Sequence, residues 1–126
     1  MKSVTVGWFE IPVQDMDRAI QFYEEVFECK LSKQVMGDFQ MAWFPWDESQ
    51  GGAGGSLVYH KDFYHSSREA GPLVYFSCED CAVKLEKVKE AGGEVMIPKR
   101  QISPEIGFMG VFFDTEGNRI ALHSQK

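Results

Sequence analysis

The stretch WFEIPVQDMDRAIQFYEEVF, residues 8–27, joins the pattern of a strand to the pattern of a helix. Hydrophobic and β-branched residues alternate along residues 3–13, which predicts a β-strand there. From Asp15 onward the hydrophobic residues recur at three- and four-residue intervals, at Met16, Ala19, Ile20, Tyr23, Val26 and Phe27. That spacing predicts an amphipathic helix to about Glu28, with Asp15 as its N-cap because its carboxylate can accept a backbone N–H of the first turn.

The same order returns in the second half of the chain. Residues 72–79, PLVYFSCE, read as a strand, and Asp80 is the expected N-cap of a helix that ends at Gly92-Gly93. Three more strands are predicted after each helix, at 31–36, 39–46 and 55–61, and again at 94–102, 107–114 and 118–125. Trp8 precedes Asp15 by seven residues, and Leu73 precedes Asp80 by the same seven. This shared spacing indicates a duplicated β-α-β-β-β unit.

We therefore predict an α+β fold in which two repeated β-α-β-β-β units form an eight-stranded curled mixed sheet with a cleft. Residues 1–126 form a single domain, with units at 1–60 and 71–126 and a linker at 61–70. In the first strand Phe9 and Ile11 suit the helix-covered face, so Trp8 and Glu10 point to the opposite face. If the two sheets curl together, these uncovered faces line the cleft. The alternative is a ferredoxin-like α+β barrel, without a third strand after each helix.

Composition excludes some classes of function. The chain has 126 residues, of which 44% are hydrophobic, and a formal net charge of -6. A charge of this sign argues against nucleic acid as a partner, since phosphate binding needs a basic patch. We find no apolar run long enough for a membrane span and no secretory leader, so we expect a soluble, cytoplasmic protein. Cys78 and Cys81 form a C-x-x-C without a second ligand pair, and we interpret them as structural rather than redox-active or zinc-binding.

Four segments resemble the vicinal-oxygen-chelate superfamily, which includes glyoxalase I, extradiol dioxygenases, and the bleomycin and fosfomycin resistance proteins. They are FEIPVQDMDRAIQFYEEVF, GGAGGSL, EAGGEV and FFDTEGNRIAL. Within them, D-x-x-R-A-x-x-F-Y runs from Asp15 to Tyr23 and D-x-x-G-N-x-I runs from Asp114 to Ile120. The resemblance covers nearly the whole chain and is nearest to an uncharacterised glyoxalase-related group. Its motifs are specific for the fold but not for an activity, because this scaffold carries many chemistries.

The resemblance implies where metal ligands would lie. Metal-dependent members place His or Glu on the first and last strands of each unit, and the ion binds two neighbouring substrate oxygens. Here those positions fall on Trp8, Leu73 and Ala121, and the fourth falls in the strand around Gly55–Val58. Indole, isobutyl and methyl groups offer no lone pair to a cation, and a shift of that fourth position finds only Tyr59 and His60. We therefore predict no metal and no other cofactor.

Another pair of side chains can take the place of a metal set. Glu10 lies two residues from Trp8, and His123 lies two residues from Ala121, each on the same strand face. If the strands converge, a carboxylate–imidazole pair can act in acid–base chemistry or hold a weak metal. Glu10 is thus the tentative catalytic residue, although it can equally satisfy buried polar groups and His123 can equally be solvated. His60 and His65, in the polar segment that links the units, are most simply surface residues.

The uncovered faces also suit a ligand. The predicted ligand-binding residues are Trp8, Glu10, Ser56, Tyr75, Ser77, Arg119 and His123, a set of aromatic side chains with a few polar groups. We expect a protein that binds a small, aromatic or planar molecule in an apolar cleft without a metal. The alternative is a divergent lyase, isomerase or dioxygenase that uses Glu10, with or without a non-standard metal. We also expect a homodimer, with Trp43, Phe44 and Trp46 at the interface, because exposed edge strands need a partner or a cover.

Overall fold

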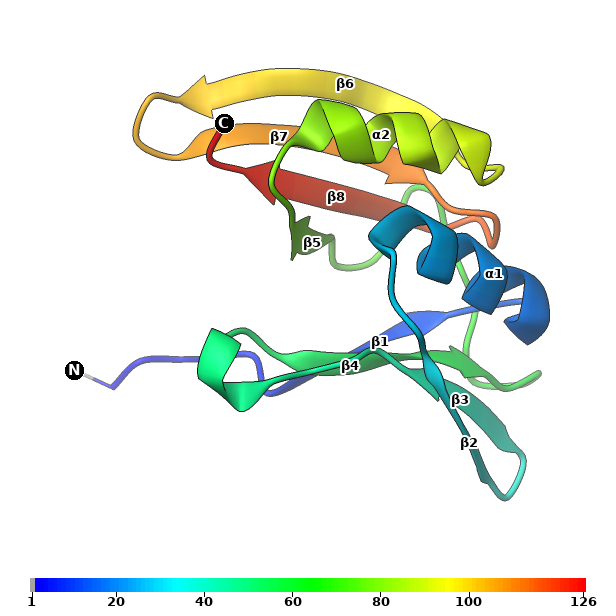
Figure 1. Ribbon diagram of the computed structural model, residues 1–126. Helices are drawn as coiled ribbons and strands as arrows, with labels where there is room; N and C mark the ends of the chain where they lie inside the picture. The colour runs from blue at the N-terminus through cyan, green and yellow to red at the C-terminus, as the bar shows by residue number, and fades with distance from the viewer. Residues whose placement is uncertain (1) are drawn as a thin grey trace.

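The computed structural model describes residues 2–126, and within them each half of the chain repeats one order of elements (Figure 1). The first unit contains β1 (Trp8–Pro12), α1 (Met16–Phe27), β2 (Ser32–Met36), β3 (Phe39–Trp43), a short 3₁₀ turn (Glu48–Gln50) and β4 (Gly54–Tyr59). The second contains β5 (Val74–Ser77), α2 (Cys81–Glu90), β6 (Glu94–Ser103), β7 (Gly107–Phe113) and β8 (Arg119–Ser124). The duplicated α+β fold is therefore confirmed, and the three strands after each helix exclude the ferredoxin-like alternative. Strand β1 begins at Trp8 rather than at residue 3.

Both helices begin where the sequence predicts. The Asp15 carboxylate accepts the backbone N–H of Arg18 at 3.1 Å, and the Asp80 carboxylate accepts that of Ala82 at 2.9 Å. These bonds satisfy backbone donors that have no partner inside the first turn of a helix. After α2 the chain reverses at Gly92, whose φ of 101° lies in the left-handed region that glycine adopts most easily.

The strands form two four-stranded sheets with the same topology. Their orders are β1-β4-β3-β2 and β5-β8-β7-β6. In each sheet the first strand pairs in parallel with the last, and the other pairs are antiparallel. Ladders join strands only within a sheet, so the eight strands are divided between two sheets rather than hydrogen bonded into one.

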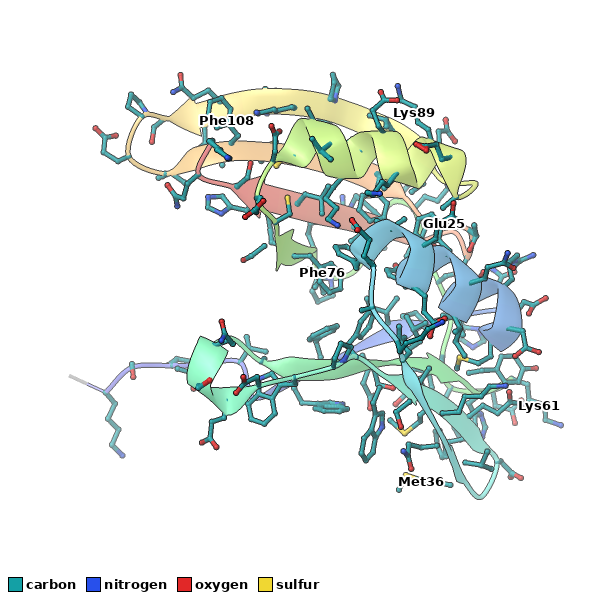
Figure 2. The ribbon with its side chains drawn as sticks, viewed as in Figure 1. Glu25, Met36, Lys61, Phe76, Lys89 and Phe108 are labelled. Carbon is teal, nitrogen blue, oxygen red and sulfur yellow. The ribbon has the colours of Figure 1, made fainter. Side chains whose placement is uncertain are left out.

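The two units meet through their helix-covered faces. Figure 1 shows the sheets as two layers with α1 between them, and Figure 2 shows Phe76 pointing from the upper layer into that space. The Phe76 ring lies 5.6 Å from Phe9 of β1 and 4.8 Å from Phe27 of α1, centroid to centroid. The core continues through residues of both units, including Tyr23, Leu57, Val88 and Leu122. The sequence-based expectation that the uncovered faces of one chain enclose a common cleft is therefore wrong, because burying these rings turns the uncovered faces outward.

The turn DTEGN at 114–118 ties the second unit to the first. The buried Glu116 carboxylate accepts the backbone N–H groups of Gln14 and Asp15 at 2.9 and 2.8 Å and the Arg18 guanidinium at 2.8 Å. Burial acts to raise the pKa of Glu116, but these hydrogen bonds hold it below its usual value. A carboxylate from one unit thus satisfies the donors at the start of the helix in the other.

Asp114 makes a second link from the same turn. Tyr23 Oη donates to its carboxylate at 2.6 Å, and Asn118 Nδ2 donates to it at 2.9 Å. Asn118 also donates to the Pro12 carbonyl at 2.7 Å. Burial is the largest influence on Asp114 and raises the pKa of its carboxyl group.

Within residues 2–126, no helix is long and apolar enough to cross a bilayer.

Candidate functional site

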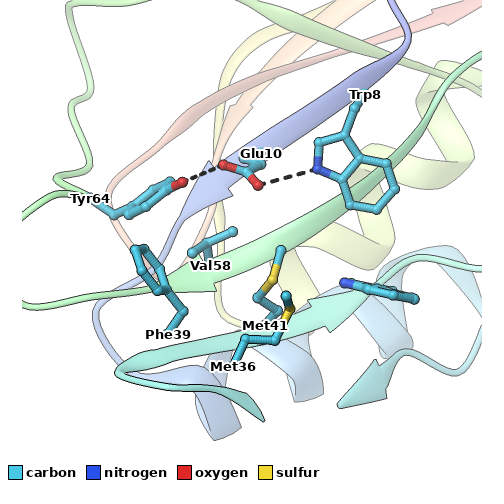
Figure 3. Close-up of a pocket in the computed structure, with 8 residues that line it drawn as sticks. Trp8, Glu10, Met36, Phe39, Met41, Val58 and Tyr64 are labelled. Carbon is cyan, nitrogen blue, oxygen red and sulfur yellow. Dashed lines mark hydrogen bonds between the residues drawn. The ribbon is translucent and has the colours of Figure 1, made fainter. Parts of the chain in front are cut away.

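A cavity of about 340 Å³ lies on the uncovered face of the first sheet. Its eight lining residues combine aromatic rings, thioethers, one aliphatic side chain and one carboxylate (Figure 3). They are Trp8, Glu10, Met36, Phe39, Met41, Trp43, Val58 and Tyr64. The cavity is predominantly apolar and open to solvent, and a single acidic group lies at its wall.

Strand register explains why these side chains gather. Glu10 and Trp8 point to one face of β1 because alternate residues of a strand share a face. Val58 of β4 pairs with Met41 of β3, and Met41 is two residues from Trp43 on the same face. Tyr64 comes from the segment between β4 and β5, which folds back over the sheet. The cavity therefore has a sheet as its floor and part of the linker as a wall.

Glu10 is held at both of its carboxylate oxygens. Trp8 Nε1 donates to one oxygen at 3.2 Å, and Tyr64 Oη donates to the other in a short hydrogen bond (Figure 3). The hydrogen bond to Glu10 raises the pKa of the Tyr64 phenol. The Tyr64 ring also meets Phe39 edge to face, with centroids 6.0 Å apart. The carboxylate is thus oriented by one residue of its own strand and one of the linker.

At the other end of the cavity, Trp8 packs against a second indole and lies close to a glycine. Trp8 and Trp43 pack edge to face with centroids 6.0 Å apart. A Cβ at Gly54 would lie 3.3 Å from Cζ3 of Trp8 and 3.4 Å from Cγ of Trp46. The absence of a side chain at Gly54 therefore lets the indoles of Trp8 and Trp46 lie against the backbone of β4.

Ser56, a predicted ligand-binding residue, lies beneath this surface. It is fully buried, and its hydroxyl donates towards the backbone carbonyls of Leu57 at 2.6 Å and Ala42 at 3.2 Å. Its partners in the sheet are Glu10 of β1 and Trp43 of β3. In this position Ser56 supports the floor of the cavity, and its direct contact with a ligand stays a prediction.

The other predicted residues lie on the second sheet. Tyr75 pairs with Ala121, and Ser77 pairs with His123. The His123 Nε2 atom lies 2.5 Å from the Ile106 carbonyl oxygen, and Arg119 donates to the Gly71 carbonyl at 3.2 Å. None of these side chains is among the eight that line the Glu10 cavity.

The hypothesised pair of Glu10 and His123 is therefore not formed within one chain. The two side chains belong to different sheets and have different hydrogen-bond partners. This follows from the meeting of the helix-covered faces, which directs the two uncovered faces away from each other.

Register also identifies the fourth position of the metal set. Glu10 pairs with Ser56 in the first sheet as Tyr75 pairs with Ala121 in the second, so Ser56 is the counterpart of Ala121. The four positions thus hold Trp8, Ser56, Leu73 and Ala121. The only side-chain oxygen among them is the buried Ser56 hydroxyl, which already donates to backbone carbonyls. This set of side chains does not fit a divalent ion. Within residues 2–126 no three His, Cys, Asp or Glu side chains are grouped so that they can hold a metal.

Several residues that line the cavity were not predicted from the sequence. Met41 and Val58 follow from strand alternation once the register is known, and Met36 and Phe39 flank the turn between β2 and β3. Tyr64 had no local signal, because nothing in the linker sequence indicates that it returns to the sheet. His60 was read as a surface residue, but it is buried between Phe39 and Phe63, at 4.5 and 4.7 Å between ring centroids.

His65 and the cysteines of the C-x-x-C segment do not line this cavity. His65 lines a separate, more polar cavity of about 320 Å³ together with His60, Lys61 and the far side of Tyr64. Cys81 is buried at the start of α2, and burial together with Cys81 raises the pKa of Cys78 to about 12. A thiol of such a high pKa is rarely ionised near neutral pH, which does not favour Cys78 as a nucleophile.

Comparison with known proteins gives a consistent result for the family and the fold. The model of the Glyoxalase/Bleomycin resistance protein/Dioxygenase superfamily matches residues 5–122. A glyoxylase-like domain-containing protein of Didymella fabae is 25% identical over 121 residues, which cover 93% of this chain and 91% of that protein.

Solved structures extend this comparison. A mutant of glyoxalase I from Zea mays superposes with a TM-score of 0.74 at 20% identity, over 94% of this chain and 46% of that one, so the chain spans about half of the maize enzyme. TnmS3, an antibiotic-binding protein from Streptomyces sp. CB03234, superposes with a TM-score of 0.67 at 27% identity, over 100% of this chain and 99% of that one. The likeness to the maize enzyme concerns the fold alone, whereas TnmS3 matches along its whole length.

Proposed function

We propose, since the chain belongs to the Glyoxalase/Bleomycin resistance protein/Dioxygenase superfamily, that this member binds a small planar or aromatic molecule without a metal. The observation that carries the proposal is the cavity on the first sheet. It places four aromatic rings and two methionines around one oriented carboxylate. Ligand sites of soluble proteins have this composition, with apolar walls that bury a ligand and few polar groups that orient it.

Two further observations support binding over metal chemistry. The positions where the family resemblance expects metal ligands carry an indole, an isobutyl group, a methyl group and a buried hydroxyl. A dication that enters such a site loses its hydration without gaining anionic or lone-pair ligands. TnmS3, which matches this chain from end to end, is itself an antibiotic-binding protein. A related scaffold of the same length therefore serves binding.

The proposal is tested by metal analysis and ligand titration on the same preparation. We expect well under about one equivalent of Zn, Ni, Mn or Fe per chain after dialysis, since a structural or catalytic site retains its ion through several ligands. We expect a panel of planar aromatic compounds to include some that raise the melting temperature in a concentration-dependent way. About one equivalent of metal that is lost on Glu10→Ala would overturn the proposal. So would a panel without any binder.

A second function is favoured by the contact between Glu10 and Tyr64. A carboxylate and a phenol joined by a hydrogen bond at the wall of a cavity can pass a proton to or from a substrate. Such a pair would suit the proton transfers of a metal-independent lyase or isomerase that uses Glu10. If the protein is such an enzyme, Glu10→Gln abolishes turnover of any bound compound while its binding persists. A binding protein leaves each compound chemically unchanged over days.

We further propose a homodimer. Trp43 and Trp46 are 39% and 56% exposed, and the second sheet exposes Tyr75 on its own open face. These apolar side chains remain partly exposed in the single chain, and a second copy would bury them further. Phe44, expected at the interface, instead packs in the core against Phe9 and Phe76, at 5.7 and 5.5 Å between centroids. Sedimentation at tens of micromolar should give a dimer, and Trp46→Ser should shift it towards monomer.

A further inference from the structure

The lining of the first-sheet cavity indicates which class of molecule it takes. Resting on the function proposed above, we propose that the ligand is an organic cation, a protonated or quaternary amine carried on a flat hydrophobic skeleton. The ammonium group lies against Glu10, and the skeleton lies among the aromatic rings and methionines.

The first argument is charge. Glu10 is the only carboxylate among the eight lining residues, and none of the eight is Lys, Arg or His. The side chain is exposed, so a ligand seated on the cavity removes water from it. Removing water from a carboxylate is unfavourable unless an opposite charge or further donors replace the water. A cationic ligand supplies that charge, whereas a neutral ligand does not and an anionic one is repelled.

The second argument is the orientation of the carboxylate. Trp8 Nε1 and Tyr64 Oη each donate to one oxygen of Glu10, so the group is fixed before any ligand arrives. Each oxygen can accept more than one hydrogen bond, which leaves sites for an ammonium N–H or for contact with a quaternary group. A preorganised carboxylate loses little side-chain entropy on binding.

The third argument is the arrangement of the rings. Trp8 with Trp43, and Phe39 with Tyr64, form two edge-to-face pairs at interplanar angles of 83° and 88°. Rings in mutually perpendicular planes present their electron-rich faces in different directions around one small space. A cation is attracted to such faces, and indole attracts it most strongly. Met36 and Met41 add polarisable, adaptable walls for the apolar part of the ligand.

The neighbouring cavity gives the contrast. It is lined by His60, Lys61, His65 and other polar groups, and it holds no carboxylate among its eight lining residues. Tyr64 is the one lining residue common to both cavities. Of these two cavities only the first is lined by a carboxylate, in a chain whose formal net charge of -6 also attracts cations.

The test uses three probes that share one ring system and differ in charge. They are (2-naphthylmethyl)trimethylammonium, 2-naphthylmethanol and 2-naphthylacetate, titrated by calorimetry and by backbone-amide NMR shifts. We expect the cation to bind roughly tenfold or more tightly than the alcohol, and the acetate to bind most weakly. Shifted amides should cluster on β1, β3, β4 and the segment that carries Tyr64.

Variants separate charge from shape. Glu10→Gln keeps an acceptor for Trp8 but removes the charge, and it should weaken the cation roughly tenfold while the alcohol changes less than about twofold. Glu79→Gln removes an exposed carboxylate of the second unit and should leave all three affinities unchanged. Tyr64→Phe, which retains the ring but not the hydrogen bond, should weaken the cation less than Glu10→Gln does. Melting curves establish that each variant is folded.

Different results would overturn the organic-cation ligand and the binding function on which it rests. Equal binding of the cation and the alcohol in this cavity, unchanged by Glu10→Gln, would overturn the organic cation and leave the binding function standing. The absence of binding by all three probes at millimolar concentration, or shifts confined to other surfaces, would overturn both.

Discussion

On the open face of the first sheet Glu10 faces Ser56 across the parallel strand pair, and at the matching place on the second sheet Tyr75 faces Ala121. The first face is hollowed into the aromatic cavity. On the second sheet, Met109, Val111 and Ala121 are buried in a small cluster with Leu73 and Ile97. The two units share element order and strand pairing, although the β6–β7 ladder carries register shifts that the β2–β3 ladder lacks. One duplicated scaffold thus carries a cavity on one open face and a small packed cluster on the other.

The two units also differ in how the start of each helix is stabilised. The N-terminus of α1 is satisfied by Glu116, a carboxylate of the other unit, whereas Cys81 N at the start of α2 donates to the Ser124 hydroxyl of its own unit at 3.2 Å. The first unit, which carries the cavity, is thus held in place by the second. Matched substitutions in the two units can test how far this division of roles extends.

The largest effect is expected at the starts of the helices. Glu116→Ala leaves the backbone N–H groups of Gln14 and Asp15 without a partner and removes the anion that faces Arg18. We expect a loss of about 3 kcal/mol in the free energy of unfolding, measured by urea denaturation. Ser124→Ala, the matched change in the second unit, should cost about 1 kcal/mol. Equal losses would show that the two helix starts are equivalent.

The next effect concerns a cross-strand pair that differs between the units. Phe9 pairs with Gly55 in the first sheet, where Val74 pairs with Ile120 in the second. A Cβ at Gly55 would overlap the Phe9 ring, so we expect Gly55→Ala to destabilise the protein by about 2 kcal/mol through overpacking.

Gly54→Ala is the control for this substitution. Its Cβ would approach Trp8 no closer than 3.3 Å, so its cost should stay below about 1 kcal/mol. A smaller loss for Gly55→Ala than for Gly54→Ala, in the same denaturation assay, would mean that the Phe9 ring moves aside easily.

The open faces of the two sheets should also differ in their effect on ligand affinity. Trp8 lines the cavity of the first sheet, and Tyr75 stands on the face of the second. Trp8→Ala should weaken binding of a planar aromatic ligand by about tenfold, or roughly 1.4 kcal/mol, because it removes one of the two indole rings of the wall. Tyr75→Ala should change it little. A similar loss for Tyr75→Ala in calorimetry would indicate that a second copy brings its own second sheet to the cavity.

The smallest effect is on the dependence of stability on pH. The folded-state pKa of Glu116 lies below its usual value, so its contribution is present above the unfolded pKa of about 4.5 and is lost as pH falls through the lowered value. Asp114 has the opposite effect. Burial raises its folded-state pKa, so its contribution to folding stability is lost as pH rises through that raised pKa. We expect Glu116→Gln to flatten the acid side of the stability profile in urea unfolding between pH 3 and pH 5. An unchanged slope would contradict this assignment.

The sequence by itself determined the local structure. Alternation predicted the strands, three- and four-residue spacing predicted α1, and Asp15 and Asp80 were correctly identified as N-caps. These features follow from neighbouring residues, because a repeat of 2 or 3.6 residues is set by the backbone itself. The duplication followed from the equal distances to the two caps. Trp8 and Glu10 were correctly placed on one face, because alternation along a strand does not depend on the rest of the fold.

Only the tertiary structure decided which faces meet and which residues complete the cavity. Burial of Phe9, Phe44 and Phe76 in one core brings the helix-covered faces together, and this separates Glu10 from His123. Tyr64 reaches Glu10 because the linker folds back, 54 residues further along the chain. Such contacts depend on the total apolar surface that the whole chain can bury, and no local repeat in the sequence records that choice.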